Sequence, residues 1–321
     1  MRFNKMVVLD GYTLNPGDLD WSCVSSLAQR FSVYDRTLAA DILARAAGAD
    51  VLLTNKTPLD ASTLARLPSL KYIGVLATGT NVVDLEAAAS AGICVTNVPG
   101  YGPDAVAQMV FAHILHHTQR LAIHDDAVRS GHWRSQPDFC FTLAPLMSLK
   151  GKTLGLVGFG DIGRQVARIA TAFDMRLLVH TRKRPDLHAF PSASWTSLEA
   201  VLGESDILSL HCPLTPETDR MINAQSLERM KPGALLINTA RGGLVDEAAL
   251  AAALEAGRLR AGLDVLSTEP PAQDNPLLSA PNVSLTPHNA WATREARQKL
   301  LHIASANLQA FLQGQIINRV N

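Results

Sequence analysis

The chain has 321 residues, of which 29 are basic and 29 acidic, so its formal net charge is zero. This balance provides no electrostatic attraction to nucleic acid or to an anionic membrane, and no run of about 18 apolar residues is present to cross a bilayer. We therefore expect a soluble, cytoplasmic protein that binds neither, with enough residues for two domains. The four cysteines are far apart and form no Cys-x-x-Cys pair, which argues against a disulfide framework or a zinc site.

The first hundred residues alternate short apolar runs with amphipathic stretches, which predicts a parallel sheet covered by helices on both faces. After the third run the chain continues with the small residues Ala77, Thr78 and Gly79. Backbone N–H groups of such a loop can hold an anion at the end of a strand, and a plain turn is the alternative. The predicted strands are 6–9, 51–54, 72–76 and 94–97, and the predicted helices are 19–29, 38–47 and 84–91.

A Pro/Gly cluster at residues 99–103 interrupts this pattern, and we place a domain crossing and hinge there. The segment from 104 to about 127 then reads as one long helix. His113 and His117 on this helix have the i, i+4 spacing of a metal site, but no carboxylate or cysteine with matching spacing accompanies them. We predict packing or interface histidines and no metal.

Residues 152–184 read as strand, glycine turn, helix and strand, the context of a dinucleotide-binding unit. An apolar strand at 153–157 leads into the turn, and a second strand follows the helix at 177–179. Glycines in such a turn permit a tight bend, close approach of backbone to a pyrophosphate, and packing of helix on strand. The pyrophosphate would then lie against unpaired N–H groups at the start of the helix. The predicted contacts are Gly158, Phe159, Gly160, Asp161, Ile162 and Gly163.

The end of the second strand bears on the choice of nicotinamide cofactor. A NAD-binding unit has an acidic residue there to accept hydrogen bonds from the ribose. This chain instead continues with Thr181, Arg182 and Lys183. A hydroxyl followed by cations suits a 2′-phosphate, so we predict that NADP(H) is preferred and NAD(H) is possible. The alternative is a solvated basic turn.

Four more apolar runs give this half of the chain six strands, the number of the dinucleotide-binding fold. Arg241, Glu269 and His288 each lie just beyond the carboxyl end of one of these runs, so we expect them to converge at one edge of the sheet. A final amphipathic helix is predicted at 300–312 and could return to cover the first domain. The four runs are 207–210, 235–238, 262–265 and 283–285.

Several motifs together resemble the D-isomer-specific 2-hydroxyacid dehydrogenases, from about residue 50 to the end of the chain. NPGDL, the TGTNVVD loop and the tryptophan of PHNAW make the chain look most like the branch of glycerate dehydrogenase, hydroxypyruvate reductase and glyoxylate reductase. The motifs are LATGTNVVDLEAAA, NVPGYGPDAVAQ, GLVGFGDIGRQVA, SDILSLHCPLTPETDRMI, MKPGALLINTARGGLVDEAAL, GLDVLSTEPP and PHNAWATREAR.

The resemblance implies that Arg241 binds the substrate carboxylate and polarises the keto oxygen, while His288, paired with Glu269, gives and takes the proton. Hydride transfer to a carbonyl carbon develops negative charge on oxygen, which a protonated imidazole neutralises. A neighbouring carboxylate orients that ring, and arginine matches a 2-oxo acid in two-point contact.

The resemblance also assigns the remaining site residues. The loop Ala77, Thr78 and Gly79 would hold the substrate carboxylate through backbone N–H groups. Asp264 would lie near the nicotinamide. The further expected cofactor contacts are His211, Cys212, Pro213, Thr218, Thr239 and Ala240.

We therefore expect an α/β protein of two doubly wound parallel-sheet domains. Residues 1–100 and 291–321 would form a flavodoxin-like substrate-binding domain, and residues 101–290 a Rossmann dinucleotide-binding domain. The active site would lie in the cleft, which closes by hinge motion at 97–103 and near Ala290. The resemblance implies a homodimer formed through the long helix and the segment around Trp133.

The expected reaction is NAD(P)H-dependent reduction of a small 2-oxo acid, glyoxylate or hydroxypyruvate, to the D-2-hydroxy acid, and the reverse oxidation. Two alternatives stay open. One is a dehydrogenase of the same fold for a bulkier 2-oxo acid or for phosphite. The other is a non-catalytic NAD(P)H-sensing binder similar to the corepressors that share this fold.

Overall fold

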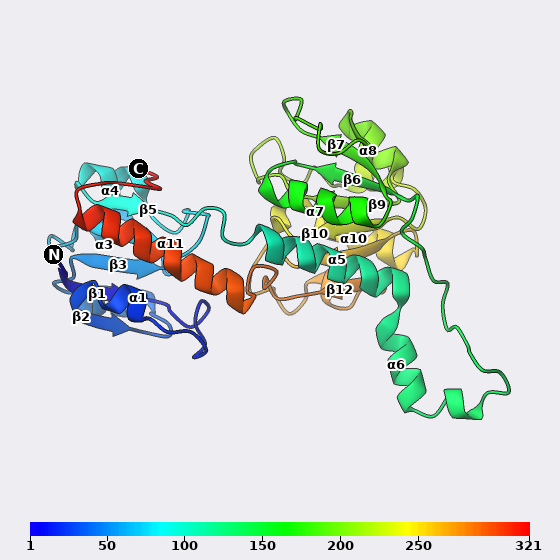
Figure 1. The fold of residues 1–321 in the computed structure, drawn as a ribbon, viewed down its shortest axis with the longest axis horizontal. Coiled ribbons are helices and arrows are strands. Elements are labelled where there is room, and N and C mark those ends of the chain that lie inside the picture. Colours follow the sequence, from blue (N-terminus) through cyan, green and yellow to red (C-terminus); the bar gives the residue numbers. More distant parts are fainter. The chain divides into compact units, whose positions relative to one another are not determined.

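The computed structural model describes all 321 residues, which form two compact units. Unit 1 comprises Met1–Gly102 and Ala292–Asn321, and unit 2 comprises Pro103–Trp291. Each unit contains one sheet in which every strand pair is parallel, with helices on both faces (Figure 1). This confirms the predicted fold class. None of the helices combines the length and apolar character that a bilayer crossing needs.

The sheet of unit 1 has five strands in the order β2-β1-β3-β4-β5. Its central strands are buried along their whole length, as expected of parallel strands covered on both faces. The helices around it are short, apart from the last one. The strands are β1 (Phe3–Val8), β2 (Ala28–Val33), β3 (Val51–Thr54), β4 (Tyr72–Val75) and β5 (Cys94–Thr96), and the helices are α1 (Ser22–Ser25), α2 (Ile42–Ala46), α3 (Ala61–Leu64), α4 (Leu85–Ser90) and α11 (Arg294–Leu312).

Two predicted helices of unit 1 were wrong in extent. In place of one helix over 19–29, α1 covers only Ser22–Ser25, and the chain then enters β2. Pairing with β1 in register from Phe3↔Ala28 to Val8↔Val33 outweighs the local helical preference of this segment. The predicted helix at 38–47 is a 3-10 turn followed by α2.

Helix α11 starts at Arg294, six residues before the predicted start, because its first turn is polar and shows no apolar periodicity. Thr293 caps this end by accepting a hydrogen bond from the Ala296 N–H. Arg297 is buried and forms a two-point ion pair with Asp18, with distances of 2.6 and 2.7 Å. The helix therefore packs on the rest of unit 1 partly through a buried arginine, which a pattern of apolar residues does not reveal.

The sheet of unit 2 has seven strands in the order β12-β11-β10-β9-β6-β7-β8. The six predicted strands are present, and the seventh, β8, was missed because its sequence, Ala-Ser-Trp, is not an apolar run and its side chains are largely exposed. The strands are β6 (Thr153–Val157), β7 (Arg176–His180), β8 (Ala193–Trp195), β9 (Ile207–Leu210), β10 (Leu235–Asn238), β11 (Arg260–Leu263) and β12 (Val283–Leu285).

Helices cover both faces of this sheet and enclose two hydrophobic clusters. One cluster lies under α5 and α7, and the other under α8, α9 and α10. The helices of unit 2 are α5 (Pro103–Gln119), α6 (Leu121–Arg129), α7 (Asp161–Ala172), α8 (Leu198–Glu204), α9 (Ala224–Arg229) and α10 (Glu247–Glu255).

The predicted long helix from 104 to about 127 is divided in two at Arg120, which has a φ of 53°. The returning chain stabilises the end of α5, because Met147 donates its N–H to the Thr118 carbonyl at 3.0 Å. Neither proline nor glycine marks the break, so the sequence gives no signal for it. Beyond it, α6 has no buried residue and projects from the rest of unit 2 as an arm (Figure 1).

Candidate active site

The carboxyl ends of the strands of unit 2 meet at one edge of the sheet because all seven strands run in parallel. The central order β11-β10-β9-β6-β7 places the segments after these strands next to one another. These segments contain Asp264, Arg241, His211, the glycine turn and Thr181. The sheet topology therefore places these five segments at one edge of the sheet.

The glycine turn after β6 requires glycine at two positions. Gly158 has a φ of 99°, and a Cβ atom there would lie 2.5 Å from the carbonyl carbon of His211. A Cβ atom on Gly163 would lie 2.5 Å from the carbonyl oxygen of Gly158. The turn is thus packed against the end of β9 and against the first turn of α7.

The N-terminus of α7 is open to a ligand. Gly160 is its N-cap residue and provides no side chain to cap the helix, and a Cβ atom at Gly160 would meet nothing within 4 Å. The first N–H groups of the helix are therefore free to bind an anion, which the helix dipole also favours. This cradle fits the pyrophosphate of a dinucleotide.

Two buried polar atoms near this edge have no hydrogen-bond partner: Nδ1 of His211 and Oγ1 of Thr239. Such groups are rare in folded proteins, and these two are able to hydrogen-bond a bound molecule. Burial lowers the pKa of His211 to about 4, so its ring is neutral, and its Nε2 lies 2.9 Å from Oγ of Ser209. Both unpartnered atoms belong to residues predicted to contact the cofactor.

The remaining predicted cofactor contacts, after β9 and β10, interact with residues of their own loops. Thr218 donates its hydroxyl to the Pro213 carbonyl at 2.8 Å and accepts the N–H of Thr215 at the same distance. The Cys212 thiol lies 3.8 Å from Sδ of Met221. Ala240 donates its N–H to Oδ1 of Asn238 at 3.0 Å, at the end of β10.

The basic turn after β7 keeps its cations exposed. The Thr181 hydroxyl donates to the Lys183 carbonyl, and Trp195 donates its Nε1–H to the Thr181 carbonyl at 3.3 Å. Arg182 and Lys183 lie at the surface. The charge of Arg182 contributes to the lowered pKa of Glu217, for which the hydrogen bond from Thr215 is the largest cause.

Nδ1 of His288 lies 2.6 Å from Oε2 of Glu269, within hydrogen-bond distance. Glu269 also accepts the N–H of Leu266 through its other oxygen at 3.2 Å. The side chains of His288 and Glu269 are 30% and 35% exposed. Because Nδ1 faces the carboxylate, Nε2 is the ring nitrogen that can meet a substrate.

The backbone that carries His288 is held by Asp264, which is buried. His288 has a φ of 50°, and its N–H donates to the carbonyl oxygen of Asp264 at 2.8 Å. The Asp264 carboxylate accepts the N–H groups of Asn289 and Ala290 at 3.0 and 2.9 Å and the Thr286 hydroxyl at 2.6 Å. Burial raises the pKa of Asp264, and these hydrogen bonds oppose the shift. Sequence reasoning missed Thr286.

The turn that carries Arg241 lies directly against the segment that leads to Glu269. A Cβ atom on Gly242 would lie 1.9 Å from the carbonyl carbon of Leu266, so only glycine fits. Asn238 donates its side-chain amide to the Arg241 carbonyl at 2.8 Å. Asn238 and Gly242 were not predicted as site residues, although both lie in the NTARG stretch.

The loop of unit 1 at Ala77, Thr78 and Gly79 follows β4 and is bonded to the chain after β5. The Thr78 hydroxyl donates to the Val98 carbonyl at 2.9 Å, and Val98 donates its N–H to the Ala77 carbonyl at 3.0 Å. No N–H group of the three residues donates to another group of unit 1. These N–H groups can therefore bind an anion.

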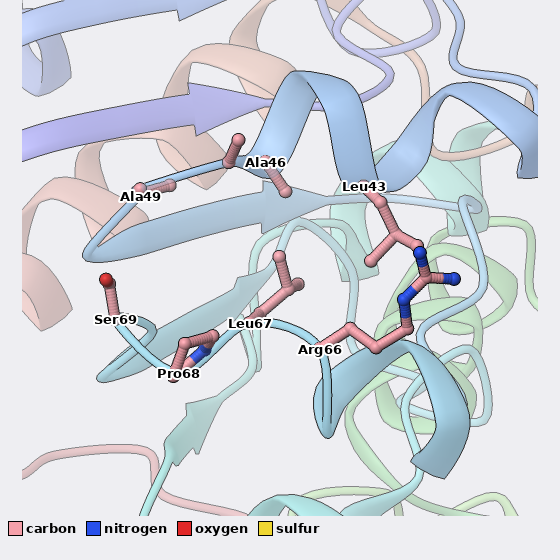
Figure 2. Close-up of a pocket in the computed structure, with 9 residues that line it drawn as sticks. Leu43, Ala46, Ala49, Arg66, Leu67, Pro68 and Ser69 are labelled. Carbon is pink, nitrogen blue, oxygen red and sulfur yellow. The ribbon is translucent and has the colours of Figure 1, made fainter.

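A hollow of about 200 Å³ lies elsewhere in unit 1 (Figure 2). Ala46, Ala49 and Ser69 line it, in segments that precede β3 and β4. This is the amino end of the strands, whereas open α/β sheets bind ligands at the carboxyl ends. We therefore assign this hollow no part in the candidate site.

His113 and His117 do not belong to any cluster of three or more metal-ligating side chains, and the chain contains no such cluster. Both histidines are buried, and each has a ring nitrogen within hydrogen-bond distance of Oγ of Ser284.

Known protein families match this chain over most of its length. The family model of the D-isomer-specific 2-hydroxyacid dehydrogenase NAD-binding domain matches residues 111–290. Hydroxypyruvate reductase of Blautia hydrogenotrophica is 42% identical over 99% of both chains. Glycerate dehydrogenase of Methylorubrum extorquens is 39% identical over 98% of both chains. Glyoxylate reductase of Thermococcus litoralis is 42% identical over 83% of this chain and 80% of its own.

Solved structures agree with this grouping. The TT0316 protein of Thermus thermophilus is 38% identical, with a TM-score of 0.85 over 99% of this chain and all of its own. An acyclic imino acid reductase in complex with NADPH and D-Arg is 29% identical, with a TM-score of 0.84 over 99% of this chain and all of its own. An NAD-complexed D-isomer-specific 2-hydroxyacid dehydrogenase of Lactobacillus delbrueckii is 27% identical, with a TM-score of 0.79 over the same shares.

The glycine cradle at α7 and the unpartnered polar atoms beside it fit the nicotinamide cofactor of this group. The chain therefore belongs to the D-isomer-specific 2-hydroxyacid dehydrogenases, oxidoreductases that use a nicotinamide cofactor.

Proposed function

We propose that this enzyme reduces glyoxylate and hydroxypyruvate to the D-2-hydroxy acids, prefers NADPH, and catalyses the reverse oxidation. The observation that carries the proposal is the His288–Glu269 pair, 2.6 Å apart and partly exposed beyond the carboxyl ends of the sheet. The relatives named for hydroxypyruvate, glycerate and glyoxylate support the choice of substrates.

In the proposed mechanism His288 donates a proton from Nε2 to the keto oxygen of the substrate. Glu269 accepts a hydrogen bond from Nδ1, which fixes the ring orientation and stabilises the charged imidazolium. A nicotinamide cofactor held at the glycine turn would supply the hydride for C2 of the acid. In the reverse direction the neutral ring of His288 takes the proton from the hydroxyl group.

Arg241 would bind the substrate carboxylate and polarise the keto oxygen. Its guanidinium is always charged and offers several donors in one plane, which suits a 2-oxo acid. Asn238 holds the Arg241 carbonyl, so the turn is fixed before substrate binds. The free N–H groups of Ala77, Thr78 and Gly79 would provide a second set of donors to the carboxylate.

The preference for NADPH rests on the turn after β7, where no carboxylate follows the strand and Arg182 and Lys183 are exposed. Cations at this point would pair with a 2′-phosphate, which NADH lacks. Thr181 would shape the turn through its hydrogen bond to the Lys183 carbonyl.

The test is steady-state kcat/KM for glyoxylate and hydroxypyruvate, each with NADPH and NADH, for the wild-type chain and for Arg182→Ala. We expect turnover of at least one acid, a higher kcat/KM with NADPH, and a loss in Arg182→Ala about 10-fold larger with NADPH than with NADH. Wild-type preference for NADH, or equal losses with both cofactors, would contradict the cofactor proposal. No turnover in any of the four pairings would contradict the substrates.

We also propose that two copies of the chain associate through the arm formed by α6 and the residues up to Leu146. The arm has internal bonds: Trp133 donates its Nε1–H to the Phe139 carbonyl at 3.0 Å, and Leu143 donates its N–H to Nε2 of His124 at 3.1 Å. Large apolar side chains on it are nevertheless exposed, a feature of protein interaction surfaces. They are Leu121, Ile123, Val128, Trp133, Phe139, Leu143 and Leu146.

A further inference from the structure

Two buried histidines of α5 lie on the sheet of unit 2, where most neighbouring side chains are apolar. His113 and His117 are 3% and 1% exposed. The helix approaches β11 closely at Gly262, where a Cβ atom would lie 2.7 Å from Cβ of His113. Buried polar rings in such a place need hydrogen-bond partners, so their partners indicate what they do.

The partners form a continuous chain that ends at Asp264. Nε2 of His117 lies 3.0 Å from Oγ of Ser284, which lies 2.7 Å from Nδ1 of His113. Nε2 of His113 lies 3.2 Å from Oγ1 of Thr286. The Thr286 hydroxyl in turn donates to Oδ1 of Asp264 at 2.6 Å.

The number of available protons fixes the direction of this chain. Burial lowers the pKa of His113 to about 4, so the ring is neutral near pH 7 and carries a single N–H. The Thr286 hydroxyl gives its only proton to Asp264, so His113 must donate to Thr286 from Nε2. Nδ1 of His113 is then an acceptor, and Ser284 donates to it.

Asp264 connects this chain to the proposed proton donor. Its carbonyl oxygen accepts the N–H of His288, and its carboxylate accepts the N–H groups of Asn289 and Ala290. His288 itself has a φ of 50°, a conformation that is uncommon for a residue with a side chain. The orientation of the Asp264 carboxylate thus determines the backbone turn from which the His288 ring projects.

We infer that His113 is a positioning residue for His288, acting through the Thr286 hydroxyl and the Asp264 carboxylate. The Nε2–H group of His113 holds Thr286 in the rotamer that donates to Asp264, and Asp264 fixes the turn that aims His288. The inference rests on the proposed function and adds to it a buried residue of α5.

The first test compares kcat and KM of four variants. In His113→Leu the donor to Thr286 is lost, and in Thr286→Val the donor to Asp264 is lost with little change in shape. We expect both to lower kcat roughly 10- to 100-fold, as displacement of a catalytic group does, with KM for the cofactor changed less than about 3-fold. His113→Gln retains a donor at the position of Nε2, and His113→Asn places its amide at the position of Nδ1.

The two amide variants separate positioning from packing. We expect His113→Gln to recover most of the wild-type kcat, whereas His113→Asn stays as slow as His113→Leu. His116→Leu serves as the control, because it makes the same change on the exposed side of α5. Equal kcat in the Gln and Asn variants, or a kcat of His113→Leu within about 2-fold of wild type, would overturn the positioning role.

A second measurement does not depend on turnover. The inference requires that His113 carries its proton on Nε2. The ¹⁵N chemical shifts of its two ring nitrogens in the wild-type chain show which nitrogen is protonated. The His113 signals are assigned by their absence from the spectrum of His113→Gln. An Nδ1–H tautomer would overturn the inference even in an active enzyme. If the wild-type chain has the Nε2–H tautomer but is inactive, the proposed function is contradicted. The hydrogen-bond chain from His117 to Asp264 would then have no catalytic role.

Discussion

At the scale of single residues, the proposed chemistry depends on where one nitrogen atom points. Nδ1 of His288 is engaged by Glu269 at 2.6 Å, and the backbone of His288 is bonded to Asp264, so the ring has little freedom to turn. A preorganised donor of this kind lowers the barrier without rearranging during the reaction. The backbone of Arg241 is held by Asn238, which donates its side-chain amide to the Arg241 carbonyl, and the Arg241 guanidinium donates to the Ala240 carbonyl at 2.7 Å.

Replacement of His288 by alanine removes the proposed proton donor and leaves the glycine cradle intact. We expect kcat/KM for the 2-oxo acid to fall by about 10²- to 10⁴-fold, the usual contribution of a general acid, with little change in the Kd of NADPH. Stopped-flow turnover and fluorescence titration of the cofactor measure the two quantities. His302→Ala, an exposed histidine on α11, is the control. Unchanged turnover would remove His288 from the mechanism.

At the scale of elements, α5 combines a packing surface with two neutral histidines. Burial is the main cause that lowers the pKa of His117 to about 3, and the nearby His116, Arg260 and Arg120 add to the shift. In the unfolded chain the same group would titrate near 6.5. Between these two values the unfolded chain binds a proton that the folded chain does not, so this group makes the fold less stable as the pH falls from about 6.5.

His117→Leu should therefore reduce the sensitivity of the fold to acid. Between pH 7 and pH 5 we expect the wild-type free energy of unfolding to decrease by about 2 kcal/mol more than that of the variant. Urea unfolding curves at the two pH values measure this difference. Equal decreases would mean that His117 binds its proton as readily in the folded protein as in the unfolded chain.

At the scale of the whole molecule, one sheet in each unit presents its loops at the carboxyl ends of parallel strands, and an arm extends from unit 2. The arm leaves the helical path at Arg120 and exposes apolar side chains, among them Phe139, which is 88% exposed. Exposure of this much apolar surface to water is unfavourable in free energy, and contact with the arm of a second copy would bury that surface.

Charges placed on the arm should separate the proposed dimer. We expect the double variant Leu121→Asp, Phe139→Asp to elute with the mass of one chain in light-scattering chromatography, and the wild type with the mass of two. Leu38→Asp alters a side chain of unit 1 that is 72% exposed, similar to the 73% of Leu121, and should leave the mass unchanged. A wild-type chain that is monomeric at micromolar concentration would contradict the proposal.

The sequence by itself determined the fold class and the family, because the glycine turn, the apolar strands and the polar residues after them are local patterns. It also identified Arg241, Glu269 and His288 as candidates, since residues after parallel strands meet at one edge of a sheet. Their catalytic roles stay predictions, as does the assignment of substrate and cofactor to separate domains. Three features were not predicted because they depend on contacts with distant residues. Strand β2 pairs with β1. The end of α5 before Arg120 is bonded to Met147, and the first turns of α11 are held by the ion pair between Arg297 and Asp18.

Only the tertiary structure showed how the candidate site is supported. Thr286 is an ordinary residue after a strand until the fold brings it within 2.6 Å of Asp264, 22 positions earlier in the chain. His113 has the spacing of a metal ligand on its helix, yet its partners are Ser284 and Thr286, 171 and 173 positions away. Hydrogen bonds over such separations depend on the packing of α5 on β11 and β12, and no local pattern in the sequence encodes that packing.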